Sequence, residues 1–180
     1  EEGRGRDGAL VSAADLDNLL AALRSSTRGE RGVRLDGRRK GIVGELARAF
    51  NELAQTRERT TDEIVRVANT IGREGKLTER AETKEAEGTW RASLDAVNSM
   101  IEDLSRPTFE VARVIDAVAD GDLTQKMQLK IEGRAVKGEF LRIGTTVNSM
   151  VDQLSSFADE VTRVAREVGT EGKLGGQAQV

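Results

Sequence analysis

The chain has 180 residues and contains no cysteine and no histidine. Without cysteine there can be no disulfide, no thiolate metal site and no thiol nucleophile. Without histidine, imidazole metal sites, Ser-His-Asp catalysis and phosphorylation on histidine are excluded as well. We therefore expect no metal, no cofactor and no catalytic residue, and the sequence does not predict an enzyme.

Aromatic residues are also scarce. They make up 3% of the chain, with one Trp, four Phe and no Tyr, whereas 33% of the residues are charged. This composition favours long solvated helices with aliphatic seams over a compact mixed core. The net charge of -3 gives no electrostatic reason to expect nucleic acid as a partner.

Long apolar runs are missing too. No stretch approaches the ~20 consecutive apolar residues of a membrane span, and the chain does not open with a signal-peptide pattern. A cytoplasmic location is therefore expected, although the parent protein could be anchored in a membrane.

What the chain does contain is a repeat. The segment Glu63–Ala68 recurs at Glu110–Ile115 and at Glu160–Ala165, at intervals of 47 and 50 residues. A second motif recurs at the same intervals around Asn51, Asn98 and Asn148. Two motifs that recur at the same intervals indicate a repeated structural unit. A unit of this size has a marginal core by itself, so each one needs a neighbour or a partner chain.

The repeats divide the sequence into five segments. We predict a disordered linker at 1–14, repeat 1 at 15–60, repeat 2 at 61–106, repeat 3 at 107–157 and the start of a truncated repeat 4 at 158–180. Each complete repeat consists of a first helix, a connector with glycines at its start and a second helix.

Apolar positions at steps of three and four predict a helix over roughly 43–71. At about 1.5 Å per residue such a helix is too long for a small globule and suits a coiled coil. Pro107, the one proline, either lies in the first turn of a helix or kinks a continuous one.

The connectors are long enough to run the length of the second helix, so the two helices of a repeat can lie parallel. Two helices leave half of a four-helix core missing, and a second copy of the chain supplies it most simply. The predicted fold is therefore all-α, with parallel homodimeric four-helix coiled-coil bundles stacked in tandem through continuous helices. The expected partners are a second copy and adjacent domains of the same chain; no small-molecule ligand is evident.

Apolar residues at helical spacing are predicted to form the dimer core, in preference to a ligand groove. They are Leu46, Phe50, Leu53, Ile64, Val67, Ile71, Leu94, Val97, Ile101, Val114, Val118, Ile143, Val147, Met150 and Leu154.

Three connector leucines, Leu77, Leu123 and Leu174, are predicted to fold back onto the helices, against the alternative of exposed loop positions. Met127 and Ala81, four residues beyond two of these leucines, are predicted as second anchors. The glycines at 75, 121 and 172 are interpreted as turn residues with positive φ. For the three repeated asparagines two roles stay open, setting the register of the coiled coil or flanking its core.

The segment Gly44–Leu53 resembles the opening of the second helix of a HAMP domain, and Gly121-Asp122-Leu123 is similar to the start of a HAMP connector. The segment 164–180 and the tandem arrangement resemble the HAMP arrays of hybrid sensor histidine kinases. The resemblance implies a non-catalytic relay, between a sensor and a histidine kinase of a two-component phosphorelay, that works by repacking dimeric bundles.

Most HAMP domains begin the second helix with an Asp-Glu pair, and here only Glu139 fits the Glu position. The resemblance implies that Glu139 braces the junction with the neighbouring helix, and Pro107 is predicted to mark a further helix junction because proline removes a backbone donor. In repeat 1, Val33 and Leu35 compete as the connector anchor. The alternative functions are a passive coiled-coil spacer or a chemoreceptor-like signalling rod; a monomeric helical repeat would instead predict short loops.

Overall fold

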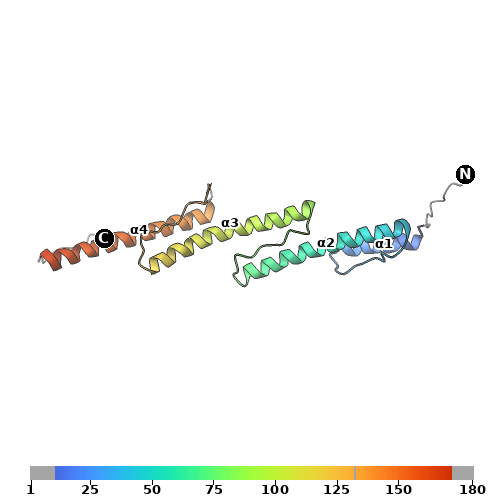
Figure 1. Cartoon of the computed structure of the whole chain (residues 1–180), viewed down its shortest axis with the longest axis horizontal. Coiled ribbons are helices and arrows are strands. Elements are labelled where there is room, and N and C mark those ends of the chain that lie inside the picture. The colour runs from blue at the N-terminus through green and yellow to red at the C-terminus, as the bar shows by residue number, and fades with distance from the viewer. Residues whose placement is uncertain (1–10, 132, 172–180) are drawn as a thin grey trace. The chain divides into compact units, whose positions relative to one another are not determined.

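A computed structural model describes residues 11–131 and 133–171. This part of the chain is mostly helical, and the predicted helix over 43–71 is confirmed (Figure 1). The helices are α1 (Ala13–Thr27), α2 (Gly41–Gly72), α3 (Gly88–Ala119) and α4 (Gly138–Glu171), and two short strands are β1 (Lys130–Ile131) and β2 (Arg134–Ala135). The chain forms two compact bodies, Glu1–Ser99 and Met100–Val180.

Three connectors join the helices: connector 1 (28–40), connector 2 (73–87) and connector 3 (120–137). Each begins next to a glycine with positive φ: Gly29, Gly75 and Gly121. Each following helix also opens on such a glycine: Gly41, Gly88 and Gly138. The predicted turn role of Gly75 and Gly121 is confirmed, whereas Gly172 lies outside the described residues. Glycine suits these sites because it reaches positive φ without a steric penalty.

Helix α1 has a complete N-terminal cap. The Asp15 backbone N–H donates to Ser12 Oγ over 3.2 Å, and the Ser12 N–H donates back to the Asp15 carboxylate over 3.1 Å. This capping box satisfies backbone donors that the first turn of a helix leaves without partners. The start of the helix is therefore fixed locally by two residues.

Pro107 lies inside the continuous helix α3, so it does not open a new helix. A proline at this depth removes one backbone donor from the helix. Near it, the Thr108 hydroxyl donates to the Leu104 carbonyl over 2.8 Å, and Ser105 is buried. At the start of the same helix, the single Trp of the chain, Trp90, is half-buried.

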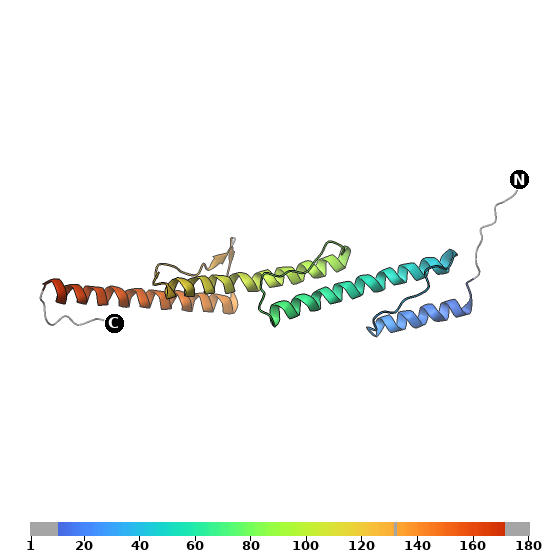
Figure 2. The ribbon, with the colours of Figure 1, turned by 60° about the horizontal axis from the view of Figure 1, so that its bottom comes forward.

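In the first body, connector 1 runs back beside α1 and the first half of α2 (Figure 2). The buried core here is formed by Ala22, Phe50 and Ala54, and three partly buried residues pack against it: Leu19, Val33 and Leu35. Both candidate anchors of connector 1 therefore contact the core.

In the second body, the core is formed by Val114 of α3, Met127 of connector 3 and Val151 of α4. The connector thus contributes a side chain to the centre of the packing. Connector 3 also contains the antiparallel pair β1–β2, in which Lys130 lies opposite Ala135. Sequence analysis did not predict this hairpin.

Candidate functional site

Each connector is held by an asparagine of the second helix. In repeat 3, the Met127 N–H donates to Asn148 Oδ1 over 2.7 Å, and Asn148 Nδ2 donates to the Met127 carbonyl over 3.1 Å. In repeat 2, Asn98 makes the same two bonds to Ala81, over 2.7 and 3.0 Å. One side chain therefore satisfies both backbone groups of one connector residue.

Repeat 1 has the same arrangement. The Leu35 N–H donates to Asn51 Oδ1 and Asn51 Nδ2 donates to the Leu35 carbonyl, both over 2.8 Å. An asparagine side chain offers one acceptor and two donors, so it can pair with an extended residue as a neighbouring strand would. We call this pair of bonds the Asn clamp and the bound residue the anchor. The sequence did not predict this clamp, and the clamp identifies Leu35 as the equivalent of Ala81 and Met127.

A second support comes from the first helix of repeat 3. Arg113 forms an ion pair with Glu110 at 3.0 Å, and its Nη2 also donates to the Lys126 carbonyl over 2.9 Å. Glu110 in turn accepts from the Gln128 N–H over 3.5 Å. These two backbone groups flank the anchor, so the connector is held on both sides.

Repeat 2 reproduces this arrangement. Arg66 pairs with Glu63 at 2.7 Å and donates to the Arg80 carbonyl over 2.8 Å, while the Glu82 N–H donates to Glu63 over 2.6 Å. The repeated hexapeptide noted in the sequence therefore contains a glutamate and an arginine that bind connector backbone. We call this pair the Glu-Arg bracket.

The glutamates of the Glu-Arg brackets have lowered pKa values because of their arginines. The hydrogen bond from Arg66 holds the pKa of Glu63 below its usual value, and the Arg113 guanidinium does the same for the pKa of Glu110. Burial opposes this lowering as the second-largest effect on each pKa, and a backbone N–H donor lowers both pKa values by a smaller amount. Both carboxylates are therefore charged at neutral pH and available as acceptors.

The same ion pair forms in α4, where Arg163 pairs with Glu160 at 2.6 Å. Residues 172–180, which follow α4, lie outside the described part of the chain. The third copy of the hexapeptide thus repeats the ion pair of the other two.

Connector 1 is supported differently. Glu58 of α2 accepts from the Gly32 N–H over 2.8 Å and pairs with Arg34 at 2.8 Å. The hydrogen bond from Arg34 lowers the pKa of Glu58 to about 2. Arg57 of the same helix donates to the Glu30 carbonyl over 2.7 Å. Here the charged support comes from the second helix.

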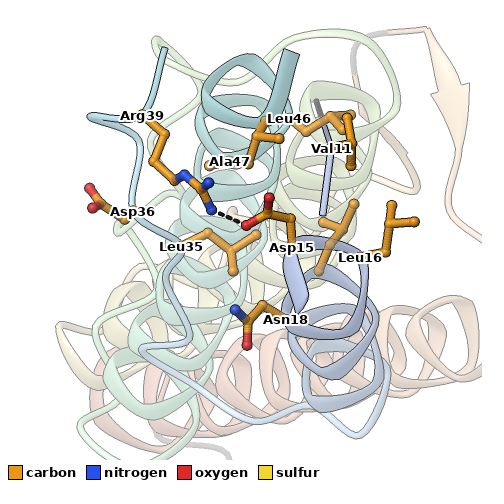
Figure 3. Close-up of a pocket in the computed structure, with 11 residues that line it drawn as sticks. Val11, Asp15, Leu16, Asn18, Leu35, Asp36, Arg39, Leu46 and Ala47 are labelled. Atoms are coloured by element: carbon orange, nitrogen blue, oxygen red, sulfur yellow. Dashed lines mark hydrogen bonds and ion pairs between the residues drawn. The ribbon is translucent and has the colours of Figure 1, made fainter. Parts of the chain in front are cut away.

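The start of repeat 1 also contains an ion pair between a buried carboxylate and a half-exposed arginine. Asp15 of α1, only 8% exposed, contacts Arg39 of connector 1 beside a cavity of about 100 Å³ (Figure 3). The remaining lining is largely apolar and includes Leu16, Leu35 and Leu46. This pair ties the start of α1 to the end of the connector.

The structure places the fifteen predicted core residues in three groups. Five are buried: Phe50, Val67, Leu94, Ile101 and Val114. Five are half-buried: Ile64, Ile71, Val97, Val118 and Val147. Five are exposed in the single chain: Leu46, Leu53, Ile143, Met150 and Leu154.

The predicted anchors and junction residues are also placed. Leu77 and Leu123 are half-buried and Met127 is buried, whereas Leu174 lies outside the described residues. Pro107 is buried within α3. Glu139 lies exposed in the first turn of α4, where it pairs with Arg142 of the same helix.

The side chains of this arrangement bind the connector backbone. Among residues 11–131 and 133–171 there is no group of acidic residues that could hold a metal ion. In the same part of the chain, none of the helices has the length and apolar character needed to cross a membrane.

A first helix, a clamped connector and a second helix thus make up one helical module, and this module recurs along the chain. Residues 85–156, which include connector 3 and its clamp, match the family model described as HAMP domain. A HAMP domain is therefore present at these residues, and HAMP domains are non-catalytic modules that relay signals in sensor proteins. No solved structure matches the chain significantly.

Proposed function

We propose that the whole described chain is a tandem HAMP array that relays conformational change between a sensor and a kinase in a hybrid histidine kinase. The HAMP domain at 85–156 supports the relay itself. The extension to the other repeats rests on the Asn clamp, because Asn51 and Asn98 bind their connectors with the same pair of bonds as Asn148. On this basis the relay would be cytoplasmic, and the catalytic domains would lie elsewhere in the parent protein.

A parallel homodimer is part of this proposal, and exposed apolar side chains carry it. Leu53, Met100 and Met150 occupy the same position in successive repeats and are 53%, 56% and 40% exposed. In α4 the stripe continues at seven-residue spacing through Ile143, Met150 and Phe157, all exposed. Seven-residue spacing is typical of a coiled-coil seam, so a second copy would cover these side chains.

The proposed relay uses helices shared between repeats. Helix α2 (Gly41–Gly72) carries the Asn clamp of repeat 1 at Asn51 and the Glu-Arg bracket of repeat 2 at Glu63 and Arg66. A rotation or shift of this helix would therefore act on two connectors at once. Bistable packing that differs by a few kcal/mol would allow such a shift to be transmitted.

Disulfide crosslinking tests the dimer directly, because the chain has no cysteine of its own. Met150→Cys places a thiol on the exposed stripe, and Thr145→Cys places one on another face of α4 as a control. Rapid crosslinking of Met150→Cys at low protein concentration, without crosslinking of Thr145→Cys, is the expected result. Equal crosslinking of both variants, or a monomer by light scattering, would contradict the proposed dimer.

A passive spacer is the competing function, and it is distinguished by the connectors. A rigid coiled-coil rod needs no clamped segments. In every described connector here, an asparagine binds both the backbone N–H and the backbone C=O of one anchor residue. In the full-length parent, loss of kinase regulation in Asn98→Ala, with the dimer intact, would support a relay. Unchanged regulation would favour the spacer.

A further inference from the structure

Two positions in each repeat vary in size in opposite directions. One is the anchor: Leu35, Ala81 or Met127. The other lies four residues before the clamp asparagine: Ala47, Leu94 or Gly144. Where the anchor is small the helix position is large, and where the anchor is large the helix position is small. We call the two positions of one repeat the anchor–helix pair.

In repeat 3 the two residues are in direct steric competition. A Cβ atom added at Gly144 would lie 2.7 Å from Met127 Sδ and 2.7 Å from Leu129 Cδ2. Met127 itself is 2% exposed, in contact with the core of Val114 and Val151. The volume next to the helix is therefore already filled by the connector, and any larger side chain at 144 must displace it.

In repeat 2 both positions are buried, and the larger residue of the pair is on the helix. Ala81 is 6% exposed and is held by Asn98, while Leu94 of α3 is 2% exposed. In repeat 1 the sizes are intermediate: Leu35 and the buried Ala47 line the same cavity. The larger residue of the pair is therefore on the connector in repeats 1 and 3 and on the helix in repeat 2.

We propose that the anchor–helix pair is the specificity determinant that matches each connector to the second helix of its own repeat. The Asn clamp binds backbone, so it would accept any of the three connectors equally. A large anchor opposite Leu94 would overpack the site, and a small anchor opposite Gly144 would leave a cavity. The pairing would hold whether or not the chain relays a signal.

A double-mutant cycle tests this in repeat 3. Hydrogen exchange of the residue 127 amide is the readout, since that N–H is bound by the clamp. Met127→Ala and Gly144→Leu should each lower its protection by about tenfold or more. The double variant, which reproduces the pair of repeat 2, should recover most of that loss. The Ala81 amide is the internal control and should keep its protection.

The mirror cycle in repeat 2 uses Ala81→Met, Leu94→Gly and their combination. Its readout is the residue 81 amide, and again the double variant should be better protected than either single one. Gly144→Ala is the milder variant if Gly144→Leu does not fold, because the first added carbon already meets Met127 and Leu129. If in both cycles the loss of amide protection in the double variant equals the sum of the two single losses, the two positions are independent and the proposal is overturned.

Discussion

Connector 1 differs from connectors 2 and 3 in where its charged support originates. Connectors 2 and 3 are bracketed by a glutamate and an arginine of the preceding helix. Near its start connector 1 is held by Glu58 and Arg57 of the following helix, and near its end by Asp15 of the preceding helix through Arg39. The Asn clamp is common to all three. The comparison teaches that the clamp defines the connector's course, whereas the charged support can come from either helix.

Removing the clamp should have the largest effect. Asn148→Ala leaves the partly buried N–H and C=O of Met127 without their partner, and we expect a loss of about 2 kcal/mol in the free energy of unfolding. Asn51→Ala and Asn98→Ala should cost similar amounts if the clamp is truly common. Urea unfolding measures the loss.

Asn148→Asp is the control for this prediction, because it keeps the acceptor for the Met127 N–H and loses only the donor to the carbonyl. Its cost should be smaller than that of Asn148→Ala. If only one of the three Asn→Ala variants lost stability, the clamp would not be a feature common to all three connectors.

Removing the charged support should have a smaller and local effect. Arg113→Ala breaks the ion pair with Glu110 and the bond to the Lys126 carbonyl. Because Arg113 is 40% exposed, water screens the pair, and we expect a loss of about 1 kcal/mol. Hydrogen exchange should accelerate in connector 3 and stay unchanged in connector 1.

Glu58→Ala should have the reverse pattern, with faster exchange in connector 1 alone. Arg142→Ala serves as the control, since its pair with Glu139 is about three-quarters exposed and has little effect on stability. Faster exchange in all connectors after either substitution would contradict separate supports.

Acid should weaken the same supports. The pKa of Glu58 falls from 4.5 to about 2 on folding because Arg34 and the Gly32 N–H stabilise its charged form. Its contribution to stability is therefore fully present above pH 4.5 and is lost as the pH falls from 4.5 towards 2. The stabilities of the wild type and Glu58→Gln, measured by urea unfolding, should converge over this interval.

Glu63 and Glu110 should act in the same direction, since the pKa values of both are lowered by their arginines. Their glutamine variants should likewise approach the wild type below pH 4.5. A constant gap between wild type and variants down to pH 2 would show that charge is not what these residues contribute.

The hairpin of connector 3 should have the smallest effect. The anchor and its asparagine are 21 residues apart in repeat 3 and 17 apart in repeat 2. Deleting residues 131–134 makes the two spacings equal and removes the β1–β2 pairing and the exposed ion pair of Arg134 with Asp103. We expect a change below about 0.5 kcal/mol in urea unfolding. A loss as large as that of Asn148→Ala would instead give the hairpin a role in the clamp.

The long helices could be predicted from sequence because their apolar spacing extends over many residues, as in α2. The turns at Gly75 and Gly121 could be predicted because few residues other than glycine adopt positive φ. Both features depend on the chemistry of single residues or on simple periodicity. They are therefore visible without knowledge of the fold.

The clamp could not be predicted, because Asn148 recognises the backbone of Met127 and the connector side chains carry no trace of it. Strands of two residues are too short to show alternation, so the hairpin left no signal. The support of connector 1 was hidden for a different reason. Glu58 lies 26 residues after Gly32, and nothing local links them.

The half-buried position of Trp90 gives the chain a built-in optical probe. It is the single Trp, and there is no Tyr, so fluorescence excited near 295 nm, roughly the red edge of indole absorption, reports on one site alone. That site lies two residues after Gly88, where connector 2 meets α3. A change in Trp90 emission would therefore report a movement where connector 2 meets α3, without an added label. Movements of the other connectors would not change the emission directly.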